Sequence, residues 1–283
     1  MPVIRHHRDS TGSAAVCHRA APTAGTIKRV FKLFRRRQKG TELRVRSRSE
    51  SAHTSRPTNV RIDFLAPDSE VLVGTLAYFK LAAFEYLTGV LPLIEQPDLR
   101  AQTASVAEEL LTRHRHYRGA FGQGDSELDF GGVQVHQADS DELWSRLSPN
   151  LWQEAVLAVY LVDGFADDFV ARLGKGAKLR TGLRWPVAER AEADAALAVL
   201  AQEIERTDWL ADRLAMWGRR LVGDSLLWCR ALMVLPDPVL RALRDTSLHR
   251  DDEVQQVISQ IEAVHADLIA GHTARMERLG LTA

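Results

Sequence analysis

The chain has 283 residues, of which 45% are hydrophobic, so it is long enough to bury the core of one large domain. Its formal net charge of zero hides an asymmetry. Residues 1–61 hold 15 lysines and arginines against three acids, which is +12, and residues 62–283 therefore carry −12. Cys17 and Cys229 are the only cysteines, far apart, which excludes a disulfide framework and a cysteine-rich zinc site and suits a reducing cytoplasm.

Residues 1–60 form a basic leader that we expect to be disordered, because it is rich in Arg, Ser and Thr and poor in apolar residues. Within it, residues 26–34 place apolar side chains at helical spacing among basic ones. This pattern is typical of an amphipathic helix that contacts RNA or an anionic membrane, and the composition also fits a transit peptide. A disordered leader, or a start site placed too early, explains the same residues.

From about residue 61 to residue 283, helical periodicity with short Gly- or Pro-containing breaks predicts an all-α, antiparallel bundle. Val133–Val135 is expected to be a short extended piece, Asp141–Leu147 one or two helical turns, and Gly280 the end of the last helix. The expected helices cover approximately residues 66–91, 98–120, 150–173, 186–206, 208–234, a short stretch after Pro238, and 251–279.

Val71–Ile94 is the longest apolar segment, and it contains Lys80 and Glu85 near its centre. Each charge is costly in the hydrocarbon of a membrane. We therefore predict a buried bundle helix, no transmembrane segment and a cytoplasmic location.

Four successive helices place ionisable side chains among the apolar residues of their inward faces. Buried charges must pair, bind a metal or change protonation state, so their recurrence on four helices predicts that they meet in the core. The residues are Lys80 on the first helix, Arg113 and His116 on the second, Asp163 with Asp167 one turn beyond on the third, and Glu189 and Glu192 on the fourth.

The helices resemble the ferritin-like superfamily, in particular its actinobacterial MiaE-like branch, named after the tRNA 2-methylthio-isopentenyl-adenosine hydroxylase. The resemblance covers about residues 63–283 and implies a ferritin-like bundle with additional C-terminal helices. Its most specific piece is Trp217-Gly-Arg-Arg-Leu-Val-Gly223. The other matching stretches are Gly74–Phe84, His116-Tyr117, Tyr160–Phe169 and Ala274–Leu281.

In such bundles two irons lie between four helices, bound by single carboxylates and Glu-x-x-His pairs. The resemblance places Lys80 and Arg113 at two ligand positions, and neither cation can ligate a metal. It leaves a degenerate dimetal site whose remaining candidate ligands are His116, Asp163, Glu189 and Glu192. Lys80 and Arg113 are expected to pair with these acids instead, although a single-metal or repositioned site fits the same residues.

Two functions follow from this site. The first is a ferritin-like protein without a cofactor, or one that binds metal weakly, in a structural or regulatory role. The alternative is a MiaE-like non-haem di-iron oxygenase that hydroxylates a modified nucleoside or a small organic substrate, with iron as its cofactor. A third function would act through the basic leader on RNA or an anionic membrane. A homodimer is a possible assembly, and no residue pattern identifies a substrate.

Overall fold

The computed structural model describes residues 60–119, 131–174, 191–245 and 251–283, all within the second of two compact units, Ser49–Ala283. In these ranges the regular structure is helical, with no strand. The predicted all-α fold is therefore confirmed for the described residues. All but residue 60 of the predicted leader, and the first five residues of the fourth predicted helix, lie outside these ranges.

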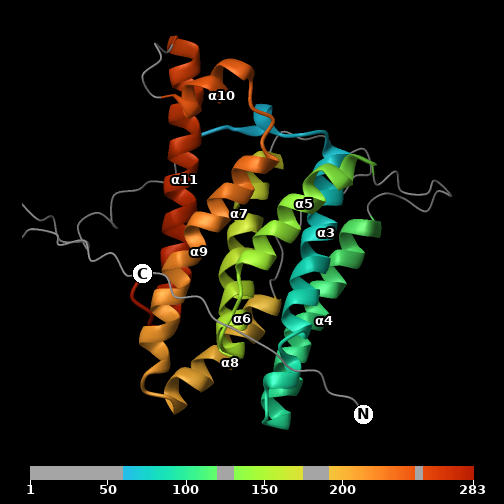
Figure 1. Ribbon diagram of the computed structural model, residues 1–283, viewed down its shortest axis with the longest axis vertical. Coiled ribbons are helices and arrows are strands. Elements are labelled where there is room, and N and C mark those ends of the chain that lie inside the picture. The colour runs from blue at the N-terminus through green and yellow to red at the C-terminus, as the bar shows by residue number, and fades with distance from the viewer. Residues whose placement is uncertain (1–59, 120–130, 175–190, 246–250) are drawn as a thin grey trace, which may run out of the picture. The chain divides into compact units, whose positions relative to one another are not determined.

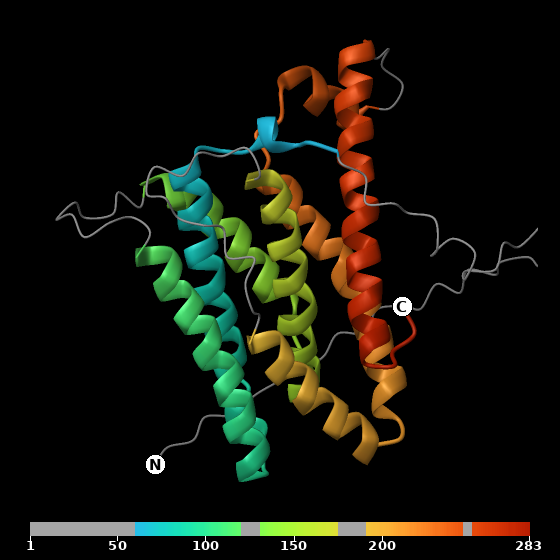
Figure 2. The ribbon, with the colours of Figure 1, turned by 180° about the vertical axis from the view of Figure 1, so that it is seen from behind.

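Helices α3 (Ser69–Thr88) and α4 (Pro97–Gly119) pack as a hairpin joined by the short η2 turn (Leu91–Leu93). Proline at the first position of α4 has the φ angle that a helix needs, and Asp98 in its first turn favours the positive end of the helix dipole. Figures 1 and 2 show this pair at one edge of the bundle, with α11 (Asp252–Arg278) at the opposite edge.

Residues 152–173 form one continuous helix that contains an irregular turn. It comprises α6 (Trp152–Ala158), a π-helical turn η3 (Val159–Asp163) and α7 (Gly164–Leu173). The Glu154 carboxylate accepts the backbone N–H groups of Asn150 (2.7 Å) and Leu151 (3.2 Å) and so caps the first turn. Single π-helical turns within α-helices are frequently found at functional sites.

Helices α8 (Ala191–Arg206) and α9 (Leu210–Leu232) complete the core, and α10 (Asp237–Arg244) leads into α11. The last helix ends where the sequence predicted. Gly280 takes a φ of +69°, a conformation that glycine adopts without strain. The Leu281 N–H then donates to the Met276 carbonyl (3.0 Å) and the Gly280 N–H to that of Glu277 (2.9 Å), which is a Schellman motif.

The segment before α6 differs from the prediction. Val133–Val135 is not extended, and Asp141–Leu147 is not an isolated turn. Both belong largely to α5 (Gly131–Arg146), a 16-residue helix that packs against α3 and α9. Trp144 of α5 lies between the rings of Phe79 (5.4 Å between centroids) and Tyr86 (4.9 Å) of α3. This burial outweighs the weak helix preference of glycine and valine in the segment.

Helix α3 with η2, Ser69–Leu93, is long and apolar enough by length and composition to cross a membrane, and 56% of its most apolar window is buried in the bundle. The core helix of a bundle meets the same criterion, so this is weak evidence for a membrane span. Lys80, near the middle of the helix, is fully buried against protein groups. The absence of a transmembrane segment stays a prediction.

Candidate functional site

Five charged side chains from four helices meet in the core, and we call them the ion-pair cluster. The cluster consists of Lys80 (α3), Arg113 (α4), Asp163 and Asp167 (η3 and α7) and Glu192 (α8). The contacts of α3 with α4, of α4 with α8, and of η3 with α3 and α8 bring these side chains together.

Lys80 has no exposed surface, so its charge is balanced only by protein groups. Its Nζ donates to Oδ1 of Asp163 and to Oδ1 of Asp167, the latter at 2.9 Å. The attraction of these two carboxylates outweighs the opposing effect of burial and raises the pKa of Lys80. Lys80 is therefore held in its charged ammonium form in the bundle centre.

Arg113 joins all three acids of the cluster. Its Nη2 donates to both carboxylate oxygens of Asp167, at 2.8 and 2.9 Å, and its Nη1 donates to Oδ2 of Asp163 at 3.2 Å and to Oε1 of Glu192. Burial acts against the charge, but the surrounding carboxylates outweigh it and raise the pKa of Arg113. A guanidinium with several donors in one plane suits this arrangement better than a lysine would.

The positions of Asp163 and Asp167 follow from the local helix geometry. Asp163 ends the π-helical turn and is followed by regular α-helix, so Asp167 lies one turn further on almost the same face. Both can then point toward α3 and α4.

The pKa values of Asp167 and Glu192 are shifted in opposite directions. Burial alone would raise the pKa of Asp167, but the charges of Lys80 and Arg113 outweigh it and lower that pKa. Burial and the negative charge of Asp163 raise the pKa of Glu192 despite the attraction of Arg113. With Glu192 protonated, two cations face two carboxylates and the cluster is neutral. With Glu192 ionised, the cluster carries one net negative charge.

The structure confirms the predicted ion pairs of Lys80 and Arg113 with Asp163, and of Arg113 with Glu192. It also pairs both cations with Asp167, which is predicted to lie among the inward-facing charges but is not one of the candidate ligands. The signal that identifies Asp167 is its spacing of four residues from Asp163 on a helix with few other inward charges. Glu189 lies outside the described residues.

The prediction that His116 joins this site is wrong. His116 is exposed, and its ring contacts that of Tyr117 with 6.0 Å between centroids. The buried stripe of α4 runs through Thr103, Leu110 and Tyr117. At 3.6 residues per turn, His116 lies roughly 120° from the centre of that stripe, whereas Arg113 lies roughly 60° from it. A long arginine side chain crosses the smaller angle, but a histidine at the larger one does not.

The acids alone could accept a metal ion. One carboxylate oxygen from each of Asp163, Asp167 and Glu192 lies within 4.8 Å of the others, and oxygen ligands of this kind suit divalent cations. However, the same three carboxylates accept hydrogen bonds from Lys80 and Arg113, whose positive charges would repel a metal. The residues present therefore do not fit a centre of two metal ions.

A family model described as "Ferritin-like domain, actinomycetes" matches residues 68–236, which include every member of the ion-pair cluster. No curated protein matches the chain.

Proposed function

Since this chain belongs to the ferritin-like domain family of actinomycetes, we propose that it is a metal-free member with a structural or regulatory role, in which the ion-pair cluster stands in place of a dimetal centre. The observation that carries the proposal is the position of the two cations. The Lys80 ammonium and the Arg113 guanidinium lie among the only carboxylates that converge between α3, α4, α7 and α8 in the described residues.

The chemistry of the two cations supports this proposal. A protonated lysine has no lone pair to offer, and arginine stays protonated in proteins. The pKa of each is raised further by the carboxylates around it. To bind a metal here, the protein would have to break the hydrogen bonds of both cations and leave them buried without partners, which is strongly unfavourable.

A second candidate is the MiaE-like di-iron oxygenase. It is favoured by the π-helical turn at Asp163, by the acids within 4.8 Å of one another, and by the stretch Trp217–Gly223 that resembles this branch. Its iron would require ligands from elsewhere, such as Glu189, in addition to the acids of the cluster. It is the weaker candidate because two cations already occupy those acids.

Metal content separates the two candidates. The full chain would be expressed in iron-replete medium, purified without chelator and analysed by mass spectrometry for iron, manganese and zinc. The proposal predicts far less than one metal ion per chain. Close to two irons per chain would make the proposal wrong and favour the oxygenase.

The replacement of the two cations gives a sharper test. The double variant Lys80→Glu/Arg113→Glu restores carboxylates at the two positions and is expected to take up iron or manganese, more so with Glu192→His added. Lys80→Gln/Arg113→Gln is the matched control, since it removes the same charges but supplies no carboxylate. If neither variant gains metal while both remain helical by circular dichroism, the cluster does not stand at a former metal site.

A further inference from the structure

The outer face of α9 carries an apolar stripe that no described part of the bundle covers. Trp209, Met216 and Leu227 are exposed by 58%, 65% and 54%. They are seven and eleven residues apart, which is close to two and three full helical turns, so they lie on one side of the helix. We call this surface the α9 stripe, and its members are Trp209, Met216, Arg220, Gly223, Leu227 and Ala231. Large apolar side chains aligned on one exposed helix face indicate a protein contact.

The middle of the α9 stripe has open space at Gly223. Gly223 is exposed, and a Cβ atom added to it would meet no other atom within 4 Å. Gly223 has no side chain to hold a second helix away, and the next residue of the stripe after Leu227, Ala231, is also small. Two helices approach most closely where their facing residues are small, so Gly223 is the natural crossing point for a second helix.

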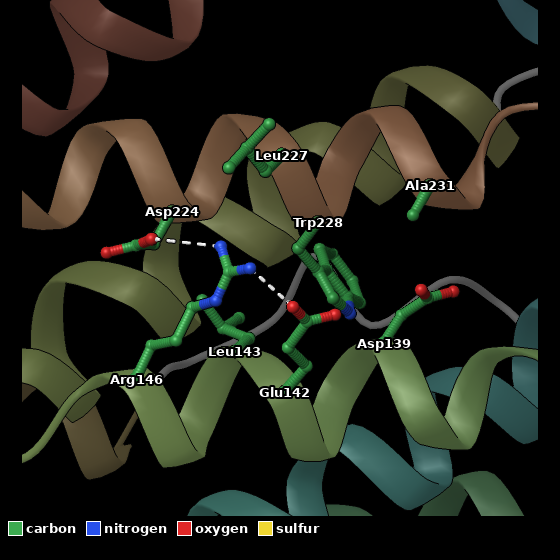
Figure 3. Close-up of a pocket in the computed structure, with 8 residues that line it drawn as sticks. All are labelled: Asp139, Glu142, Leu143, Arg146, Asp224, Leu227, Trp228 and Ala231. Atoms are coloured by element: carbon green, nitrogen blue, oxygen red, sulfur yellow. Dashed lines mark hydrogen bonds and ion pairs between the residues drawn. The ribbon is translucent and has the colours of Figure 1, made fainter.

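The charges on this face are arranged unequally along α9. On the N-terminal side of Gly223, the guanidinium of Arg220 lies over the ring of Trp217, 5.2 Å from its centroid. On the C-terminal side, α9 and α5 enclose an open pocket of about 210 Å³. Figure 3 shows the pocket, with Arg146 between Glu142 and Asp224 and with Trp228 beside them.

The pocket suits a cation with an apolar stem. Its walls include Leu143, Leu227 and Trp228, and its charged groups are the carboxylates of Asp139, Glu142 and Asp224 against the single guanidinium of Arg146. Three acids and one base leave the rim with an excess of negative charge. A second guanidinium would meet carboxylates at the rim and an aromatic ring in the wall.

We propose that the α9 stripe is the contact surface for a second copy of this chain, with the two α9 helices crossing antiparallel at Gly223 and each Arg220 entering the acidic pocket of the other copy. An antiparallel crossing at Gly223 places residues before the crossing opposite residues after it. Arg220 of one copy then faces the region of Asp224 and Leu227 of the other, and Met216 faces the region of Ala231. A two-fold interface requires this self-complementarity of one surface.

The charges favour a second copy over the basic leader as the occupant. A basic segment would match the acidic pocket but would meet Arg220 as a like charge on the same face. A second copy matches both halves, because it offers a cation to the pocket and a pocket to the cation. The large apolar residues near the crossing then lose water from both copies at once.

Cross-linking tests the geometry. In a Cys17→Ser background, Gly223→Cys puts two thiols close to the two-fold axis, where a disulfide can form. Under mild oxidation we expect a covalent species of twice 31.6 kDa. Gly119→Cys is the matched control, since a side chain there also meets nothing within 4 Å, but it lies on α4. Equal cross-linking of the two variants would overturn the proposal. So would a monomer in which the thiol at 223 is blocked from a soluble reagent, because another segment of the chain would then cover the stripe.

Substitution tests the energetics on the full chain by analytical ultracentrifugation. Met216→Asp is expected to raise the dimer dissociation constant about 100-fold, since the loss of one buried side chain counts in both copies. Leu93→Asp, at a leucine 63% exposed in the η2 turn, should leave it unchanged. Arg220→Glu should weaken the dimer, and Arg220→Glu/Glu142→Arg should restore part of it. A wild-type monomer at all concentrations, or a dimer that tolerates Met216→Asp and Arg220→Glu, would refute the assembly.

Discussion

Two arginines, the largely buried Arg113 and the buried Arg275, differ in the number of carboxylates that face them. Arg113 in the ion-pair cluster contacts three acids. Among the described residues, Arg275 of α11 pairs with one acid, Asp168, and donates to the Gly164 carbonyl at 2.9 Å. Its Nε and Nη1 atoms are buried and have no hydrogen-bond partner among the described residues.

His272 lies one turn before Arg275 on α11. We call the contact of α11 with α7 and α9 around these two residues the second region. The Nε2–H of His272 donates to the Gly218 carbonyl at 3.0 Å. Burial and the charge of Arg275 lower the pKa of His272 to about 4, although the hydrogen bond to Gly218 acts against this shift. The protein therefore buries titratable groups in two ways. The cluster balances charge with charge, whereas the contact of α11 with α7 and α9 keeps its histidine neutral.

The largest loss of stability is expected from a substitution that breaks the charge balance of the cluster. Lys80→Met leaves Asp163 and Asp167 with Arg113 as their only cation in the cluster, and the loss of one partner from a buried ion pair typically costs about 3–5 kcal/mol. The measurement is urea unfolding at pH 7, followed by circular dichroism. Lys80→Met/Asp163→Asn removes a cation and an anion together and should recover part of the loss.

Arg275→Met gives the matched comparison for the second region. Its partner Asp168 keeps 38% of its side chain exposed, so water can solvate the carboxylate that is left behind. The loss should therefore be clearly smaller than that of Lys80→Met. Equal losses in the two variants would show that the cluster gains nothing from being closed to water.

The sequence predicted the fold and the ion pairs of the cluster for physical reasons that are local. Pro97 and Gly280 mark helix ends through their own backbone preferences. Lys80 stands within an apolar stripe, where a charge must find a partner wherever the other helices lie. These features depend on a few neighbouring residues, so they can be recognised without the structure.

The errors arise where the outcome depends on how helices pack. His116 and Arg113 are one turn apart, and only the direction in which α4 faces α3 and α8 decides which of them enters the core. Helix α5 forms although its first residues prefer other structures, because Trp144 packs against α3. Asp167 has the right spacing from Asp163, but its contact with two cations appears only when three helices are assembled.

The next largest expected effect is a pH dependence of the unfolding free energy, and it comes from His272 in the second region. The folded pKa of His272, about 4, lies below its ordinary value of 6.5, so the unfolded chain binds this proton more readily. The contribution of neutral His272 to stability is therefore fully present above pH 6.5 and is lost as the pH falls toward 4. Its size is on the order of 3 kcal/mol. His272→Gln should flatten the slope of the unfolding free energy in this window. His116→Gln, at an exposed histidine, is the control and should keep the wild-type slope.

The smallest expected effect is a pH dependence of stability that comes from Glu192, and its sign is opposite to that of the His272 effect. Burial and Asp163 raise its pKa above the ordinary value of 4.5, so the folded protein holds this proton more tightly than the unfolded chain does. The stability that Glu192 contributes is then present below pH 4.5 and is lost as the pH rises through the folded pKa. Glu192→Gln keeps an oxygen that can accept from Arg113 but cannot ionise. It should be at least as stable as the wild type at pH 7.

Urea unfolding of Glu192→Gln at pH 4.5 and pH 7 checks this sign, with Glu205→Gln on the exposed side of the same helix as the control. The advantage of Glu192→Gln should be smaller at pH 4.5 than at pH 7, because a larger fraction of the wild-type side chain is then protonated. A variant less stable than the wild type at pH 7 would mean that the ionised carboxylate is a net stabilising partner of Arg113. The cluster would then hold one unbalanced negative charge in the core, which is the condition under which a cation would bind there and the metal-free proposal would lose its electrostatic basis.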